Sequence, residues 1–211
     1  MSSSRHYANI ISKELDADIR IISQGGWGVY CGWDNDIRHN IPQVYDPVCG
    51  LATGSFNESI GASKPFEPGN FQPDIVIVNL GTNDASAFEQ PPMTIPDGTV
   101  CKQRKEPDGS YNREDAEKVI AAQTGFLKKL RGYYPSSQIL WVYGMLGYGL
   151  TPVLSEGVNR YVRESGDASV KFINLPDTSD QEYGAHMHPG YESHKKAAKV
   201  LVDYIRRNLG C

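Results

Sequence analysis

Residues 74–80 read DIVIVNL, and Gly81-Thr82-Asn83-Asp84 follows them directly. A short, nearly continuous run of β-branched apolar residues is typical of a strand buried on both faces of a parallel sheet. Residues 139–143 and 170–175 are further runs of the same kind. Together they predict an α/β protein whose functional loops follow the carboxyl ends of its strands.

Helical patterns alternate with these strands. Apolar residues at three- to four-residue spacing, with capping residues and proline stops, predict helices over residues 7–15, 112–134, 152–164 and 191–208. Residues 19–22 predict one more strand, and residues 30–72 predict a long connection with at most a short helix. The order predicts a three-layer α/β/α fold with a parallel, flavodoxin-like sheet.

The start of the chain departs from this order. A doubly wound α/β protein normally opens with a strand, because the first helix packs on the sheet that this strand begins. Here the first predicted helix has no strand before it. We therefore expect one domain over residues 1–211 that is truncated at its amino terminus and lacks its first strand.

Composition limits the classes of partner. The chain has 211 residues and a formal net charge of −4, so it offers no basic face for nucleic acid or for an anionic membrane. Its apolar runs, such as residues 75–80, are far shorter than the ~20 residues of a membrane span. We expect a soluble protein without an export signal in this sequence; the compartment and the oligomeric state stay open.

Three short motifs follow predicted strands. Asn83 can donate its amide N–H to an oxygen that becomes negative in an acyl-transfer reaction, although Asn83-Asp84 also suits a simple turn or helix cap. Gly26, within Gly25-Gly26-Trp27-Gly28, can offer a backbone N–H, although an ordinary tight turn has the same sequence.

The third motif is His186-Met187-His188-Pro189, directly before the last helix. Pro189 restricts His188 to an extended backbone, and an exposed imidazole can accept a proton near neutral pH. A surface histidine is the alternative. A His-x-His pair also suits a metal ion, but no carboxylate or cysteine cluster accompanies it, so we expect neither a metal nor a cofactor.

Taken together, these motifs resemble conserved blocks of the SGNH/GDSL hydrolase superfamily. The segments YANIISKELDADIRIISQGGWGVY and WVYGMLG look like parts of carbohydrate esterase family 2, and the resemblance covers nearly the whole chain from Tyr7 onward. It implies an SGNH fold in which Gly26 and Asn83 are oxyanion donors and His188 is the general base for a serine. Trp27, Asp84 and Tyr148 would bind substrate, with Tyr30 and Trp33 as further aromatic candidates.

Two departures from the family pattern are present. The aspartate that usually precedes the histidine by two or three residues is replaced by His186 and Ala185. A backbone carbonyl, or one of Asp177, Asp180 and Glu182, would have to orient His188 instead. The GDS block that carries the nucleophilic serine is not found in the sequence, and Ser2, Ser3 and Ser4 lie where the family begins a helix.

The resemblance implies a serine esterase that deacetylates carbohydrates, with the nucleophile-bearing segment absent from this chain. We therefore expect little or no hydrolysis of p-nitrophenyl acetate by the chain itself. The alternative is a non-catalytic carbohydrate-binding or scaffold protein on the same fold.

Overall fold

The computed structural model describes residues 3–69 and 71–210. They form two compact units. Unit 1 comprises the residues up to 23, residues 143–149 and the residues from 173 onward, and unit 2 comprises residues 24–142 and 150–172.

The described helices and strands alternate along much of the chain. The α-helices are α1 (Tyr7–Leu15), α2 (Ile41–Val44), α3 (Ser55–Ser59), α4 (Thr82–Ala87), α5 (Arg113–Tyr133), α6 (Thr151–Ser165) and α7 (Tyr191–Leu209). The strands are β1 (Ile75–Val78), β2 (Met93–Thr94), β3 (Val100–Cys101), β4 (Gln138–Tyr143) and β5 (Val170–Asn174). Short 3-10 helices lie at η1 (Ser3–Arg5), η2 (Asp180–Glu182) and η3 (Ala185–Met187).

A three-stranded sheet in the order β1-β4-β5 lies mostly in unit 2, while Tyr143 of β4 and residues 173–174 of β5 belong to unit 1. Strands β1 and β4 run parallel, with Ile75 opposite Gln138 and Val78 opposite Trp141. Residues 139–142 of β4 are completely buried, as expected for a central strand that is covered on both faces. The predicted α/β class, the parallel sheet and the three apolar strands are therefore confirmed, but β1 is not buried on both faces as predicted, because only Val78 of its four residues is buried.

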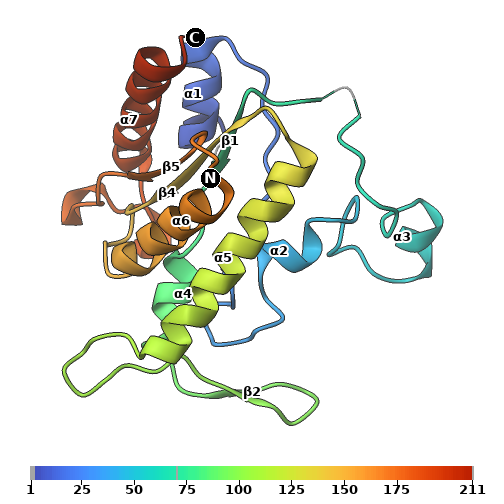
Figure 1. Ribbon diagram of the computed structural model, residues 1–211, viewed down its shortest axis with the longest axis vertical. Helices are drawn as coiled ribbons and strands as arrows, with labels where there is room; N and C mark the ends of the chain where they lie inside the picture. The colour runs from blue at the N-terminus through green and yellow to red at the C-terminus, as the bar shows by residue number, and fades with distance from the viewer. Residues whose placement is uncertain (1–2, 70, 211) are drawn as a thin grey trace. The chain divides into compact units, whose positions relative to one another are not determined.

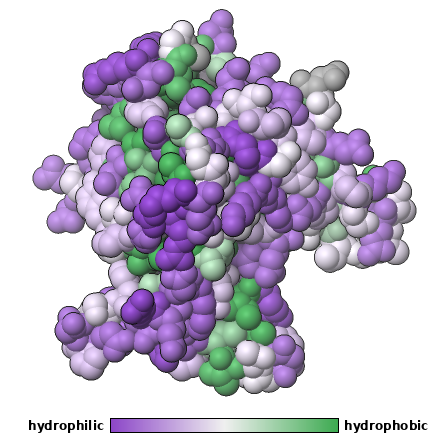
Figure 2. Space-filling view, viewed as in Figure 1, coloured by the Kyte–Doolittle hydropathy of each residue, from purple (hydrophilic) through white to green (hydrophobic). Residues whose placement is uncertain are grey.

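Helices α5 and α6 of unit 2 pack against each other (Figure 1). Helix α5 begins where the sequence predicts, because the side chain of Asn112 accepts the N–H of Asp115 at 3.3 Å. The surface over α5 is mostly hydrophilic (Figure 2). Residues 91–112, which we call the arm, contain the antiparallel pair β2–β3, and hydrophobic residues gather over that pair in Figure 2.

Unit 1 contains α1 and α7, which pack side by side (Figure 1). The buried residues Tyr7 and Ile11 lie on α1, and Ala197 and Leu201 are among those on α7. The imidazole of His6, rather than a serine, caps α1 by accepting the N–H of Ala8 at 3.3 Å. Both helices that the sequence predicts for this unit are confirmed.

Two predictions about irregular stretches need correction. Residues 17–24 take no regular secondary structure, so the strand predicted over residues 19–22 is wrong. Ile19, Ile21 and Ile22 are 40%, 51% and 56% exposed. A segment rich in β-branched residues forms a strand only where another strand pairs with it. The connection at residues 30–72 contains two short helices, α2 and α3, where at most one was expected. The extent of the domain stays a prediction.

Candidate functional site

The glycine turn in unit 2 brings Gly26 into a left-handed conformation. Its φ is +80°, and a Cβ at this position would lie 3.1 Å from the indole Cδ1 of Trp33, so both the backbone and the space favour glycine. The carbonyl of Gly26 accepts the N–H of Trp33 at 3.0 Å. Among the described residues, the N–H of Gly26 has no recorded acceptor, which leaves it available to a ligand.

Asn83 lies in the first turn of α4, directly beyond β1. Its Nδ2 donates to the carbonyl oxygen of Trp27 at 2.8 Å. A carbonyl can only accept, so this bond fixes which end of the carboxamide is the NH₂ group. The second N–H of that group is left for another acceptor. The structure therefore brings Asn83 to the glycine turn within unit 2, as the sequence suggested.

Asp84 holds the loop that follows the glycine turn. Its Oδ2 accepts the N–H of Val29 at 2.8 Å, and its Oδ1 accepts those of Tyr30 at 2.7 Å and Cys31 at 3.1 Å. The side chain is completely buried. Burial raises the pKa of Asp84, and the three N–H groups act in the opposite direction. The prediction that Asp84 binds substrate is wrong, because its carboxylate faces the loop.

Gly28 is required by the same contact. A Cβ on Gly28 would collide with Oδ2 of Asp84 and with the carbonyl oxygen of Cys31. The loop backbone can therefore approach the carboxylate closely only because this residue has no side chain. The neighbouring thiol of Cys31 is completely buried, and its pKa is raised by burial and by the charge of Asp84, so it is no nucleophile.

Aromatic side chains surround the glycine turn in unit 2. The ring of Trp27 stacks on that of His39, with centroids 5.1 Å apart and planes 20° apart. Trp33, whose backbone is bonded to Gly26, is 49% exposed. Exposed indole beside two candidate N–H donors is chemically suited to contact a ring-shaped ligand.

His188 belongs to unit 1, where its imidazole is exposed beyond η3. Its Nδ1 lies 2.8 Å from the main-chain carbonyl oxygen of His186. Since that oxygen can only accept, Nδ1 carries the proton and the lone pair of Nε2 is the basic site. His186 and Met187 have φ values of 54° and 57°, and this left-handed turn brings the carbonyl to the ring.

The carboxylates considered as substitutes have other partners. Asp177 accepts the N–H groups of Gly147 and Thr178, at 2.8 and 2.9 Å. Glu182 pairs with Lys196 and caps η2 at its amino end. No bond between Asp180 and His188 is recorded in the described part of the chain. Of the alternatives left open, a backbone carbonyl is the one that the structure contains.

Tyr148, the remaining predicted substrate residue, lies in unit 1. Its hydroxyl donates to the carbonyl of Leu175 and accepts the N–H of Asp177, both at 2.9 Å. These bonds fix the ring, which is 45% exposed. Binding of substrate by Tyr148 and by Trp27 stays a prediction, as does the cooperation of His188 with Asn83 and Gly26.

Comparison with known proteins identifies relatives of the chain. No protein-family model matches it. A solved structure, the acetyl xylan esterase Est2A from the rumen bacterium Butyrivibrio proteoclasticus, is 52% identical with a TM-score of 0.97; the match covers all of this chain and 56% of that one. The chain is a relative of the carbohydrate esterases of family 2. The resemblance stated from the motifs is thereby confirmed, and the SGNH type of fold with it.

Less similar proteins also match the chain. Cellulase/esterase CelE of Acetivibrio thermocellus is 24% identical over 218 residues, and the match covers 99% of this chain and 22% of CelE. A family two carbohydrate esterase from Clostridium thermocellum, solved with cellohexaose, is 22% identical with a TM-score of 0.72, over 99% of this chain and 55% of that one. The chain thus spans about a fifth of the curated relative and just over half of these structures.

Two features of the site were missed by sequence reasoning. The three N–H donors to Asp84 lie 53 to 55 residues before it in the chain, and no local pattern shows such a contact. The carbonyl of His186 is main chain and has no sequence signal. The described residues contain no group of three or more His, Cys, Asp or Glu side chains placed to bind a metal, and no described helix is long and apolar enough to cross a bilayer.

Proposed function

We propose that the protein carrying this chain is a serine esterase that removes acetyl groups from carbohydrates. The observation that carries the proposal is the orientation of Asn83, whose amide is fixed by Trp27 with one N–H left over. The name of the relative that is 52% identical supports the substrate class. Est2A is an acetyl xylan esterase, so acetylated xylan is the substrate with which we would begin.

Two groups in unit 2 are suited to the oxygen of the ester. As a nucleophile adds to the carbonyl carbon, its oxygen becomes negative and needs donors that are already in place. The free N–H of Asn83 and the backbone N–H of Gly26 are such donors. The clamp of Asp84 on residues 29–31 keeps the turn from adjusting, so little reorganisation is needed during the reaction.

His188 is the proposed general base. Its Nδ1–H is bonded to the carbonyl of His186, so Nε2 can take the proton of a serine hydroxyl and later give it to the leaving sugar hydroxyl. A neutral carbonyl orients the ring without a counter-charge for the imidazolium. The base therefore acts as one member of a serine–histidine dyad.

The indoles of Trp27 and Trp33 are the proposed contacts for the sugar. Trp33 is half exposed and packs against Gly26, so a pyranose ring on its free face would bring an attached ester toward the Gly26 N–H. Aromatic rings provide large apolar contact with the C–H faces of sugars. Tyr148 is retained as a further proposed contact.

Release of acetate from acetylated xylan tests the proposal, and it is measured on the protein that carries this chain together with the proposed segment bearing the nucleophilic serine. His188→Ala is expected to lower kcat by about 10²- to 10⁴-fold, and Asn83→Ala by about 10²- to 10³-fold. His186→Asn is the matched control, because asparagine tolerates the left-handed backbone and retains the carbonyl that holds His188. That variant should keep the activity of the unchanged protein.

A binding measurement on the same protein distinguishes the esterase from the non-catalytic alternative. Binding of xylo-oligosaccharides is measured by the quenching of tryptophan fluorescence. Binding without any release of acetate would overturn the esterase proposal in favour of a carbohydrate-binding role. Release of acetate that survives His188→Ala would contradict the assignment of the base.

A further inference from the structure

Helix α4, which carries Asn83, is too short to be stable without contacts to the rest of the protein. It has six residues, and Gly81 at its amino end provides no side-chain cap. Isolated helices this short are unstable in water. The placement of the Asn83 carboxamide must therefore depend on contacts made by the ends of the helix.

The loop of residues 29–35 forms hydrogen bonds with α4 near both of its ends. Asp84 binds residues 29–31 of this loop near the start of the helix. Four residues later, Asn35 binds the other end: its Nδ2 donates to the carbonyl of Ala87 at 2.9 Å, and also reaches those of Gln90 at 3.4 Å and Pro91 at 3.1 Å. The last carbonyls of a helix have no partner within the helix; here that of Ala87 also accepts the N–H of Gln90 at 3.2 Å.

Asn35 is built for this contact. It is completely buried, and its φ is +71°, a conformation that asparagine adopts more readily than most residues. Its Oδ1 accepts the N–H of Gln103 at 2.7 Å. The amide thus uses both of its ends: Nδ2 binds carbonyls at the end of α4 and at the start of the arm, and Oδ1 binds the arm at Gln103.

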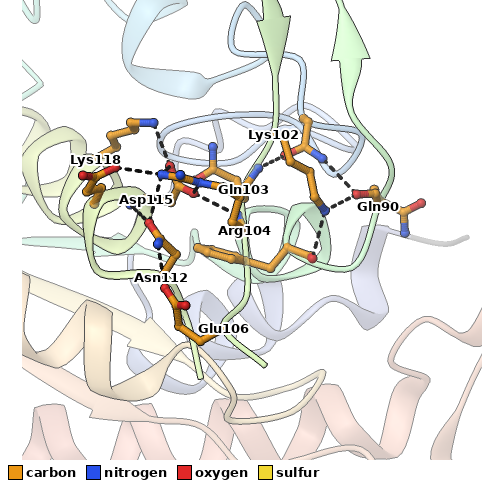
Figure 3. Close-up of polar contacts among 11 residues, drawn as sticks. Gln90, Lys102, Gln103, Arg104, Glu106, Asn112, Asp115 and Lys118 are labelled. Atoms are coloured by element: carbon orange, nitrogen blue, oxygen red, sulfur yellow. Dashed lines mark hydrogen bonds and ion pairs between the residues drawn. The ribbon is translucent and has the colours of Figure 1, made fainter. Parts of the chain in front are cut away.

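The arm supports the same end of the helix (Figure 3). Lys102 donates to the carbonyl of Phe88 at 3.2 Å and also to that of Gln90. Arg104 anchors the arm to α5, because its Nε and its backbone N–H both bind Oδ2 of the buried Asp115, at 2.7 and 2.9 Å. Lys118 pairs with the other oxygen of Asp115 at 2.7 Å.

We infer that Asn35 is a positioning residue for the oxyanion donor Asn83 and acts through α4. The inference rests on the proposed function. Asn35 ties the carboxyl end of α4 to the loop whose earlier residues bind Asp84, so the helix has a single placement relative to the glycine turn. Loss of the amide removes one of the two side chains, Asn35 and Lys102, that hold the carboxyl end of α4, and the Asn83 carboxamide then samples orientations away from the reacting oxygen.

Asn35→Gly tests this inference, because glycine removes the side chain and still accepts the left-handed backbone. The first measurement is the ¹⁵N–¹H signal of the Asn83 side-chain NH₂, assigned by its loss in Asn83→Ala. In Asn35→Gly this signal is expected to shift and its protons to exchange faster with water. The second measurement is ester hydrolysis by the protein that also includes the serine-bearing segment, for which kcat should fall about 10- to 100-fold with KM nearly unchanged.

Asn57→Ala is the matched control. Asn57 also donates its side-chain amide to a carbonyl, that of Thr53, but at an exposed position on α3. Neither the Asn83 signal nor kcat should change in this variant. An unchanged Asn83 signal in folded Asn35→Gly would overturn the inference.

A second variant covers the case in which Asn35→Gly does not fold. Lys102→Ala removes two bonds to the same end of α4 from a partly exposed side chain. It should move the Asn83 signal in the same direction, and an unchanged signal would overturn the inference. Because the NMR measurement does not depend on turnover, an inactive unchanged protein would contradict only the proposed function.

Discussion

Replacement of Asp84 by asparagine tests the clamp on the loop with almost no change in shape. The carboxylate accepts three backbone N–H groups, two at Oδ1 and one at Oδ2. The asparagine carbonyl can replace Oδ1 and keep the bonds from Tyr30 and Cys31. Its NH₂ group then faces the N–H of Val29, where two donors meet at about the distance of the lost bond.

The expected loss follows from these contacts. One hydrogen bond to a charged acceptor contributes about 1.5–3 kcal/mol, and a buried donor left without a partner costs about 1–3 kcal/mol. The two remaining bonds become neutral and weaker. Removal of a buried charge offsets part of this loss. We expect Asp84→Asn to lower the free energy of unfolding by about 2–4 kcal/mol.

Urea unfolding followed by circular dichroism measures this difference. The control is Asp97→Asn, at an exposed turn where the carboxylate accepts the N–H of Thr99 at 2.8 Å; its effect should stay within about 0.5 kcal/mol. Amide exchange at Val29 should also accelerate in Asp84→Asn. A midpoint equal to that of the unchanged protein, with slow exchange at Val29, would refute the clamp.

Three further predictions concern other positions. Gly28→Ala should lower the free energy of unfolding by about 1–3 kcal/mol, because the added Cβ would collide with Asp84 and Cys31. Gly25→Ala adds a carbon with no atom within 4 Å and should leave the free energy of unfolding unchanged; the urea midpoints of the two variants are compared. Burial and the charge of His6 lower the pKa of His194 to about 4. As the pH drops from about 6.5 to 4, the unfolded chain binds a proton at this residue before the folded protein does, so the free energy of unfolding falls. The difference between the melting temperatures at pH 7 and pH 4.5 should therefore be smaller in His194→Gln than in the unchanged protein. Gln123 is completely buried, and neither end of its amide has a partner in the described part of the chain, so Gln123→Met should raise the urea midpoint by an amount equivalent to about 1–3 kcal/mol, and a lower midpoint would speak against this reasoning.

Regular elements of the fold could be predicted because their sequence pattern reports burial directly. The apolar run before Asn83 became strand β1, although only Val78 of its four residues is buried, and the cap at Asn112 began α5 as expected. Residues 19–22 have an equally strand-like composition, yet they form no strand. The difference is a pairing partner, which is a property of the assembled sheet and not of the segment.

The candidate site was predictable to a smaller extent. Asn83 and Gly26 could be named because each follows a predicted strand and carries an N–H donor. The role of Asp84 could not be named, because its three partners come from a distant loop. Asn35 gave no signal at all: it lies in an irregular stretch, and its importance comes from the carbonyls that surround it.

The carbonyl of His186 that holds the imidazole of His188 has a consequence for how this sequence can vary. Every residue type carries that oxygen, so the contact imposes no chemical identity at position 186. The requirement is only that positions 186 and 187 tolerate a left-handed backbone, which favours glycine, asparagine and aspartate and excludes proline and β-branched residues. A saturation library at position 186 should therefore sort by backbone preference, with charge and size of the side chain having little influence.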